Sequence, residues 1–143
     1  MSSWRQQALI EAPVEAVWAL VGDPNRYPEW AGEVAEVTGL PRVEPHATFR
    51  QATRTPLGRS TTTFRIEALE AMRSIRMRCQ ASGYYSEWTL TEVRGDTFVD
   101  VEVGMEPVHL RDRAFDATLG KSWFRRVAHR SLDGLRAASR RGG

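Results

Sequence analysis

Hydrophobic and polar positions alternate along most of the chain between residues 34 and 105. A period of two is typical of β-strands that bury one face. The clearest case is residues 74–81, in which Ile75, Met77 and Cys79 alternate with Arg76 and Arg78. Gly and Pro residues break the pattern into segments, which we expect to pair as one antiparallel sheet. The predicted strands are 3–12, 34–40, 48–54, 60–68, 74–81, 84–93 and 97–105.

Two other parts of the chain carry a helical period. Pro13 precedes apolar residues at helical spacing, and a shorter helix is predicted from Asp23 or Asn25 to about Trp30. Residues 110–139 contain no proline, and their apolar stripe predicts one long amphipathic helix. That stripe consists of Phe115, Leu119, Trp123, Val127, Ser131 or Leu132, Leu135 and Ala138.

This order predicts an α+β fold with a seven-stranded, curved antiparallel sheet. The long helix must bury its stripe, and the concave face of the sheet is the surface that fits it. Two short helices after the first strand would close one end, leaving an apolar pocket between sheet and helix. We expect residues 1–143 to form a single domain, with the last few residues as a disordered tail.

A motif near the N-terminus supports this arrangement. Residues 10–21 read Ile-Glu-Ala-Pro-Val-Glu-Ala-Val-Trp-Ala-Leu-Val, and residues 23–30 read Asp-Pro-Asn-Arg-Tyr-Pro-Glu-Trp. This motif resembles the opening signature of the START-like superfamily, which includes polyketide cyclases and dehydrases, lipid-transfer proteins and plant pathogenesis-related proteins. The resemblance implies a helix-grip fold with a ligand cavity. It implies no single activity, because one fold hosts many functions.

The candidate ligand contacts are the inward-facing side chains of the predicted strands and helix. Tyr84 and Ser86 could orient a carbonyl or hydroxyl group, or hold an enolate oxygen. Gln51 would need a ligand atom or a water as partner if buried. Two alternatives stay open, namely Trp30 as a core aromatic and the tyrosines as an exposed hairpin end. The full set is Trp30, Phe49, Gln51, Phe64, Met77, Tyr84, Ser86, Trp88, Leu90, Val101, Phe115, Leu119 and Trp123.

Catalytic and metal-binding signatures are absent from the sequence. His46, His109 and His129 lack the spacing of metal ligands and read as exposed residues. Cys79 is the single cysteine, which excludes an internal disulfide, and its place on an apolar strand face predicts a small buried side chain. No phosphate-binding loop or dinucleotide fingerprint is present. We therefore expect no metal and no cofactor, and we assign no catalytic residue.

Charge is distributed unevenly along the chain. Seven of the 20 Lys and Arg residues, but one of the 18 acidic residues, lie between Lys121 and Arg141. A basic helix of this kind can bind nucleic acid or an anionic membrane, but a solvated outer helix face also accounts for the excess of basic residues. We expect no nucleic-acid partner and no stable membrane insertion. No leader or spanning stretch is visible, so a cytoplasmic location is expected. The oligomeric state is left open.

Three functions fit these features. The first is a carrier or sensor that binds a small hydrophobic molecule, a lipid or a polyketide-like metabolite, between sheet and helix. The alternative is a cofactor-free polyketide aromatase, cyclase or dehydratase acting in the same cavity, which needs a positioned acid–base pair. The third is an interaction protein whose basic helix docks on a membrane or an acidic partner.

Overall fold

The computed structural model describes residues 2–107 and 109–142. Strand β1 (Ser2–Ile10) leads into helix α1 (Val14–Val21) and the 3₁₀ helix η1 (Pro24–Glu29). The C-terminal segment consists of α2 (Leu110–Phe115), the π-helical turn η2 (Asp116–Gly120) and α3 (Lys121–Gly142). Between them lie β2 (Val34–Thr38), β3 (Thr48–Thr55), β4 (Gly58–Glu70), β5 (Ser74–Cys79), β6 (Tyr84–Val93) and β7 (Asp96–Met105).

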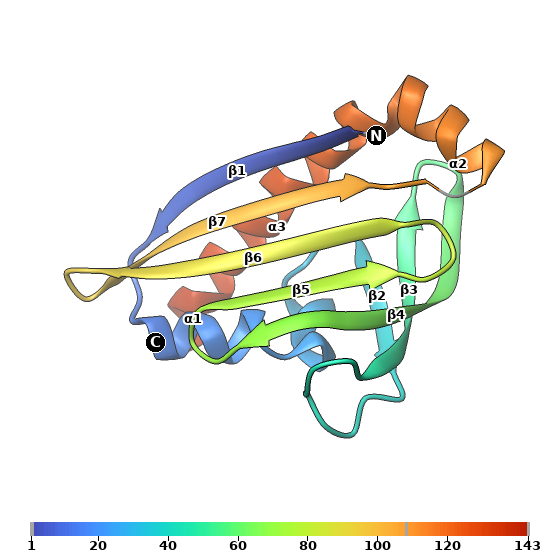
Figure 1. The fold of residues 1–143 in the computed structure, drawn as a ribbon. Helices are drawn as coiled ribbons and strands as arrows, with labels where there is room; N and C mark the ends of the chain where they lie inside the picture. Colours follow the sequence, from blue (N-terminus) through green and yellow to red (C-terminus); the bar gives the residue numbers. More distant parts are fainter. Residues whose placement is uncertain (1, 108, 143) are drawn as a thin grey trace.

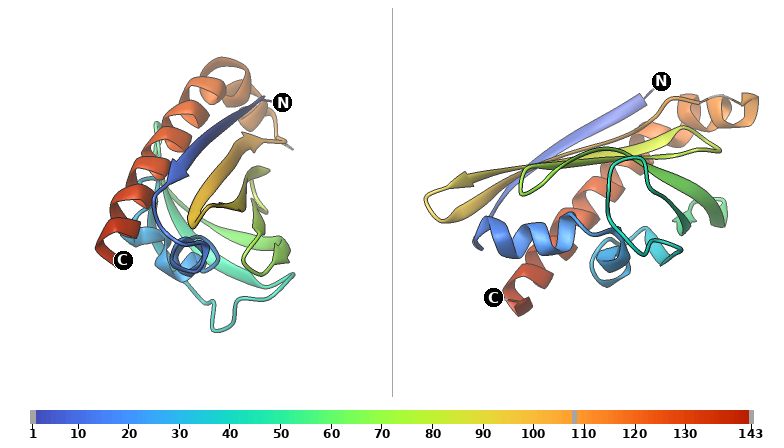
Figure 2. Two further views of the ribbon diagram at one scale, coloured as in Figure 1. Left: turned by 90° about the vertical axis from the view of Figure 1, so that its left-hand side faces the viewer. Right: turned by 60° about the horizontal axis from the view of Figure 1, so that its bottom comes forward.

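The strands form one antiparallel sheet in the order β1-β7-β6-β5-β4-β3-β2. Register shifts in β4 between Ile66 and Ala68, and in β2 between Val34 and Glu36, mark bulges that help to bend the sheet. Helix α3 crosses the concave face, as Figures 1 and 2 show. The predicted α+β helix-grip fold is confirmed.

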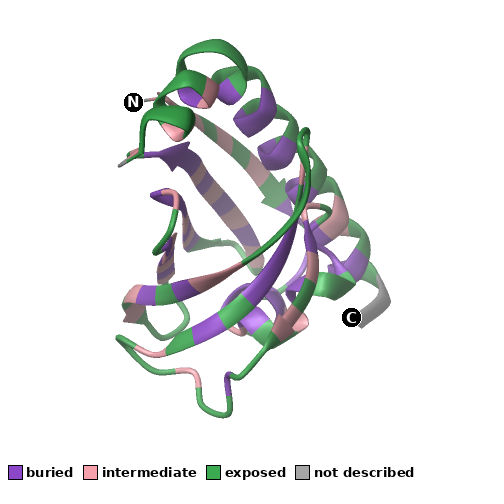
Figure 3. Cartoon of the chain, turned by 90° about the vertical axis from the view of Figure 1, so that its right-hand side faces the viewer, coloured by how far each residue is buried: buried purple, intermediate pink, exposed green. Residues whose placement is uncertain are grey.

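Burial along the strands follows the alternation in the sequence (Figure 3). On β5, Ile75, Met77 and Cys79 are buried, whereas Arg76 and Arg78 lie on the convex face. Both arginines bond the carboxylate of Glu67, at 3.0 and 2.9 Å. The convex face is therefore held by ion pairs, while the concave face supplies the core.

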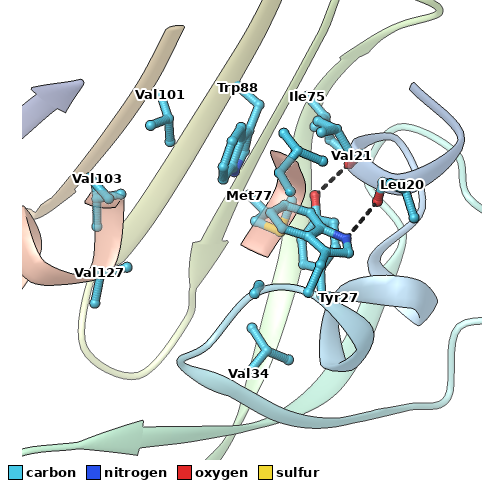
Figure 4. Close-up of a cluster of buried hydrophobic side chains, with 14 of the residues drawn as sticks. Leu20, Val21, Tyr27, Val34, Ile75, Met77, Trp88, Val101, Val103 and Val127 are labelled. Atoms are coloured by element: carbon cyan, nitrogen blue, oxygen red, sulfur yellow. Dashed lines mark hydrogen bonds between the residues drawn. The ribbon is translucent and has the colours of Figure 1, made fainter. Parts of the chain in front are cut away.

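Hydrogen bonds hold η1 in place against helix α1. Asp23 caps η1 by accepting a bond from the Asn25 backbone N–H at 3.0 Å. The Tyr27 hydroxyl donates to the Val21 carbonyl at 2.7 Å, and the Trp30 indole N–H donates to the Leu20 carbonyl at 3.2 Å (Figure 4). These bonds fix Trp30 against the inner face of the sheet.

The prediction that Leu119 faces the sheet is wrong, because its side chain is 47% exposed. The π-helical turn η2 is the cause, since its wider turn holds one extra residue and shifts the helical phase. Asp116 and Gly120 take the buried positions instead, and the Asp116 carboxylate accepts a bond from the Ser2 backbone N–H at 2.9 Å. Beyond η2 the predicted stripe resumes at Trp123.

Candidate functional site

A cavity of about 280 Å³ lies at one end of the sheet, beneath the helical segment that follows β7. The β3–β4 hairpin, the β5–β6 turn and helices α2 and α3 enclose it. Its walls are the inward residues of the strands, and its rim is formed by the hairpin tip and α2. The lining residues are Thr53, Thr55, Leu57, Gly58, Arg59, Ser60, Thr62, Phe64, Cys79, Ala81, Ser82, Tyr84, Met105, Arg111, Asp112, Phe115 and Trp123.

Four aromatic side chains form the inner wall of this cavity. Tyr84 contacts Phe64 edge to face with ring centroids 6.2 Å apart, and it lies 5.4 Å from Trp123. Phe115 packs edge-on against Trp123 at 5.7 Å. Such pairs are stabilised beyond the area that they bury. The wall is therefore apolar, and it links the sheet to the helical segment.

Polar side chains from the strands and from α2 also line the cavity. The Cys79 thiol donates to the Thr62 hydroxyl at 3.2 Å, which satisfies both side chains. Asp112 reaches in from α2, and its buried Oδ2 atom has no hydrogen-bond partner among the described residues. Arg59 and Arg111 lie exposed at the rim.

The centre of the space between sheet and helix is filled by side chains. Trp30 and Trp88 meet edge to face with ring centroids 5.2 Å apart. Figure 4 shows Trp88, Met77 and Tyr27 gathered over the inner face of the sheet. A void of about 10 Å³, close to the volume that one water needs, lies among them.

Several polar residues line this central void. The Gln51 amide donates to the Thr53 hydroxyl at 3.0 Å, while its own oxygen has no partner among the described residues. The Tyr84 hydroxyl, on a side chain only 5% exposed, also lacks a partner within the part of the chain that the structure describes. Glu33 also lines the void, and its carboxylate accepts a bond from the Ser131 hydroxyl on α3 at 2.9 Å.

Burial shifts the pKa values of two of these groups. It raises the pKa of the Tyr84 phenol well above 10.0, and the charge on Glu33 and then Cys79 act in the same direction. The pKa of the half-buried Glu33 carboxyl is also raised, because burial outweighs the opposing effects of its own backbone hydrogen bond, the Ser131 hydrogen bond and the Arg54 charge. Tyr84 therefore stays a neutral hydroxyl at ordinary pH.

Comparison with protein-family models matches residues 1–140 to the family described as polyketide cyclase/dehydrase and lipid transport. The chain belongs to this family. No curated protein matches the chain at a significant level. Solved structures in turn support the family's fold.

A START superfamily protein from Mycobacterium smegmatis is 14% identical, with a TM-score of 0.68 and coverage of 95% of this chain and 92% of that one. An AHSA1-like protein from Aeromonas hydrophila is 17% identical, with a TM-score of 0.69 over 99% and 94% of the two chains. The di-domain ARO/CYC StfQ from the steffimycin biosynthetic pathway is 18% identical, with a TM-score of 0.65. The match covers 96% of this chain but 48% of StfQ, so this chain corresponds to about half of that protein.

The thirteen predicted ligand contacts of this family member are divided between different surroundings. Phe64, Tyr84, Phe115 and Trp123 line the 280 Å³ cavity. Phe64 and Tyr84 also line the small void, together with Trp30, Gln51, Met77, Ser86 and Trp88. Phe49, Leu90 and Val101 are buried in the core without lining either space, and Leu119 is exposed. The expected single cavity is thus displaced towards one end.

Several lining residues were missed by the sequence analysis. Thr62 and Cys79 lie two positions along the strand from Phe64 and Met77, so the alternation could have identified them. Other lining residues come from turns and from α2, which carry no periodic signal. Glu33 was missed for the same reason, because it lies in the η1–β2 connection, which has no periodic pattern.

The histidines that could carry acid–base chemistry do not line the 280 Å³ cavity. The three histidines, His46, His109 and His129, are exposed, as predicted. In residues 2–107 and 109–142, no group of three or more His, Cys, Asp or Glu side chains could hold a metal ion. Over the same residues, no helix is both long and apolar enough to cross a bilayer.

Proposed function

We infer that this protein binds a small hydrophobic molecule, a lipid or a polyketide-like metabolite, as a carrier or sensor. The observation that carries this proposal is the 280 Å³ cavity with its wall of Phe64, Tyr84, Phe115 and Trp123. Moving apolar surface out of water gains about 25 cal/mol per Å². A cavity with an aromatic wall supplies that gain to any apolar guest that fits it.

The fluorescent hydrophobe N-phenyl-1-naphthylamine tests this proposal directly. Thr62 lines the cavity, so Thr62→Phe should fill part of it and weaken binding of the probe at least tenfold. Thr61→Phe is the matched control, because Thr61 is the exposed neighbour on the same strand. Equal affinities for the two variants, or no binding to the wild type, would refute the cavity as the binding site. Native mass spectrometry of the purified protein would then identify any co-purified compound.

A second candidate function is a cofactor-free cyclase or dehydratase acting in the same cavity. It is favoured by one observation, the unpartnered oxygen of Asp112, a residue that lines the same cavity as Tyr84. In a dehydration, a carboxylate would take the α-proton of a β-hydroxy ketone. The phenol would protonate the departing hydroxyl, and water would leave as the double bond forms.

This second function is tested with a β-hydroxy ketone of polyketide type and the variant Asp112→Asn. Loss of the general base should lower turnover about 10²–10⁴-fold with little change in binding. Glu106→Gln serves as the control, because Glu106 is an exposed acid that does not line this cavity. Absence of product with the wild-type protein would leave the carrier function as the better proposal.

We also propose that this protein is cytoplasmic and has no nucleic-acid partner. The unpaired Cys79 thiol suits a reducing compartment. Part of the basic face of α3 also has a structural role. The Arg125 guanidinium lies 5.8 Å from the Trp4 ring, and Arg136 donates to the Leu9 carbonyl at 3.3 Å. These contacts support a solvated outer face rather than a docking surface.

A further inference from the structure

Two buried polar atoms point to the chemistry of the ligand. The Gln51 Oε1 and Tyr84 Oη atoms have no hydrogen-bond partner in the described part of the chain, although their residues are 2% and 5% exposed. An unmade hydrogen bond at such depth is costly, so buried polar atoms nearly always have a partner. Both residues line the same 10 Å³ void, which has room for a single small polar group.

The donors and acceptors around the void select one kind of group. Gln51 Oε1 can only accept, and a carboxylate oxygen of Glu33 can also accept while that group is ionised. The Tyr84 hydroxyl can donate as well as accept. A carbonyl or ether oxygen would satisfy Tyr84 but would leave Gln51 unpartnered. A hydroxyl group can donate to Gln51 and accept from Tyr84 at once.

Tyr84 and Phe64 connect this polar void to the apolar cavity. Both residues line the 280 Å³ cavity and the void, so the two spaces lie next to each other along these side chains. A ligand whose rings fill the cavity would therefore have one end directed at Tyr84. The apolar wall and the polar end together describe an amphiphilic guest.

We propose that the ligand is a hydroxylated hydrophobe, a phenol or an alcohol, whose hydroxyl group binds between Gln51 Oε1 and Tyr84 Oη. This inference rests on the proposed function and specifies its ligand class. Ser86 and Glu33 line the same subsite and restrict it to a group of about one heavy atom. The apolar body of the ligand contacts Phe115 and Trp123.

Three probes of nearly equal shape test the subsite, namely 2-naphthol, 2-methoxynaphthalene and 2-methylnaphthalene. Dissociation constants are measured by calorimetry at neutral pH for wild type, Tyr84→Phe, Gln51→Met and Tyr85→Phe. Wild type should bind 2-naphthol about tenfold more tightly than either other probe, as expected for one or two net hydrogen bonds. Tyr84→Phe and Gln51→Met should each reduce this preference severalfold. Tyr85→Phe should keep it, because Tyr85 lies on the opposite face of the sheet and bonds Glu102.

The outcomes separate the two proposals. Equal affinity for all three probes in the wild type would overturn the hydroxyl subsite but leave apolar binding intact. Equal affinity for 2-naphthol and 2-methoxynaphthalene would show that the ligand needs no hydrogen-bond donor, which would also overturn the hydroxyl subsite. If none of the probes binds, both the subsite and the proposed function are wrong.

Discussion

Tyr84 and Tyr85 are neighbours on β6, but their hydroxyl groups have opposite surroundings. Tyr84 points to the concave face, and its hydroxyl lacks a partner within residues 2–107 and 109–142. The Tyr85 hydroxyl donates to the Glu102 carboxylate at 2.9 Å, and the Arg76 guanidinium covers the ring at 4.4 Å. Burial, followed by the Glu102 hydrogen bond, raises the pKa of Tyr85 to about 12. Cross-strand pairing with Gly104 leaves room for this ring.

Removing each hydroxyl should therefore affect stability differently. Tyr85→Phe loses a hydrogen bond to a carboxylate and should lower the free energy of unfolding by about 1–2 kcal/mol. Tyr84→Phe removes an unsatisfied group and should change it by less than about 0.5 kcal/mol, or increase it. Urea denaturation of the unliganded variants measures both. A Tyr84→Phe cost as large as that of Tyr85→Phe would mean that the Tyr84 hydroxyl has a partner in solution.

The raised pKa of Glu33 predicts a pH dependence of stability. A carboxyl whose pKa is higher in the folded state binds more protons there than in the unfolded chain. The contribution of this carboxyl to the free energy of unfolding is fully present below its ordinary pKa of 4.5. It is lost as the pH rises through the pKa of the folded state. Glu33→Gln cannot titrate, so its stability relative to wild type should rise from pH 4 to pH 7. Thermal denaturation across this range checks the prediction, and a constant difference would contradict it.

At the scale of elements, the phase of the C-terminal helical segment is set by η2. The π-helical turn rotates Leu119 out to solvent and brings Gly120 under the sheet. Beyond it, α3 buries Phe124 and Leu135 completely. The same helix also approaches the η1–β2 connection closely at Gly134.

Truncation along this segment should follow the observed phase. Leu135→Ala removes a fully buried side chain and should destabilise the protein by about 2–5 kcal/mol. Leu119→Ala should cost less than about 1 kcal/mol, because Leu119 is half exposed and alanine favours helix. Chemical denaturation of the two variants gives the comparison. Similar costs would show that Leu119 is packed after all.

Gly134→Ala should reverse the usual effect of alanine in a helix. Replacing a mid-helix glycine by alanine ordinarily stabilises by about 1 kcal/mol. Here the added Cβ would lie 1.9 Å from the Trp30 carbonyl oxygen, so the helix and the η1–β2 connection would have to separate. The variant should melt at a lower temperature than wild type. An unchanged or higher melting temperature would contradict the close approach.

At the scale of the whole molecule, a well-packed centre and an open end coexist under one curved sheet. Trp30, Trp88 and Met77 fill the middle, whereas the end beneath α2 keeps its cavity. Phe64 stands between these regions, stacked on Phe49 with ring centroids 5.8 Å apart. The division of the interior therefore depends on very few large side chains.

Phe64→Ala should enlarge both the cavity and the central void, because Phe64 lines both of them. The lost burial and the new space should lower the free energy of unfolding by about 3–5 kcal/mol. The folded variant should bind pyrene, a four-ring hydrophobe, more tightly than wild type. Chemical denaturation and fluorescence titration measure the two effects. A stability loss without any gain in pyrene binding would mean that neighbouring side chains collapse into the space.

The sequence by itself determined the strands, the helices and, outside η2, the face that each buries. Period-two alternation on β5 and the helical stripe from Trp123 onwards are local patterns, and local backbone geometry converts them into faces. Together with the N-terminal motif, they predicted the helix-grip fold and four of the residues that line the cavity.

The tertiary structure alone decided where space remains inside the molecule. A cavity is the difference between the volume that the elements enclose and the volume that side chains fill, so it depends on contacts distant in sequence. Trp30 and Trp88 pack edge to face and close the middle, so inward-facing side chains leave no large cavity there. Asp112 and Glu33 enter from segments without periodicity, and one extra residue per turn in η2 moves Leu119 to the surface. No pattern along the chain encodes these outcomes, because each depends on how separate elements meet.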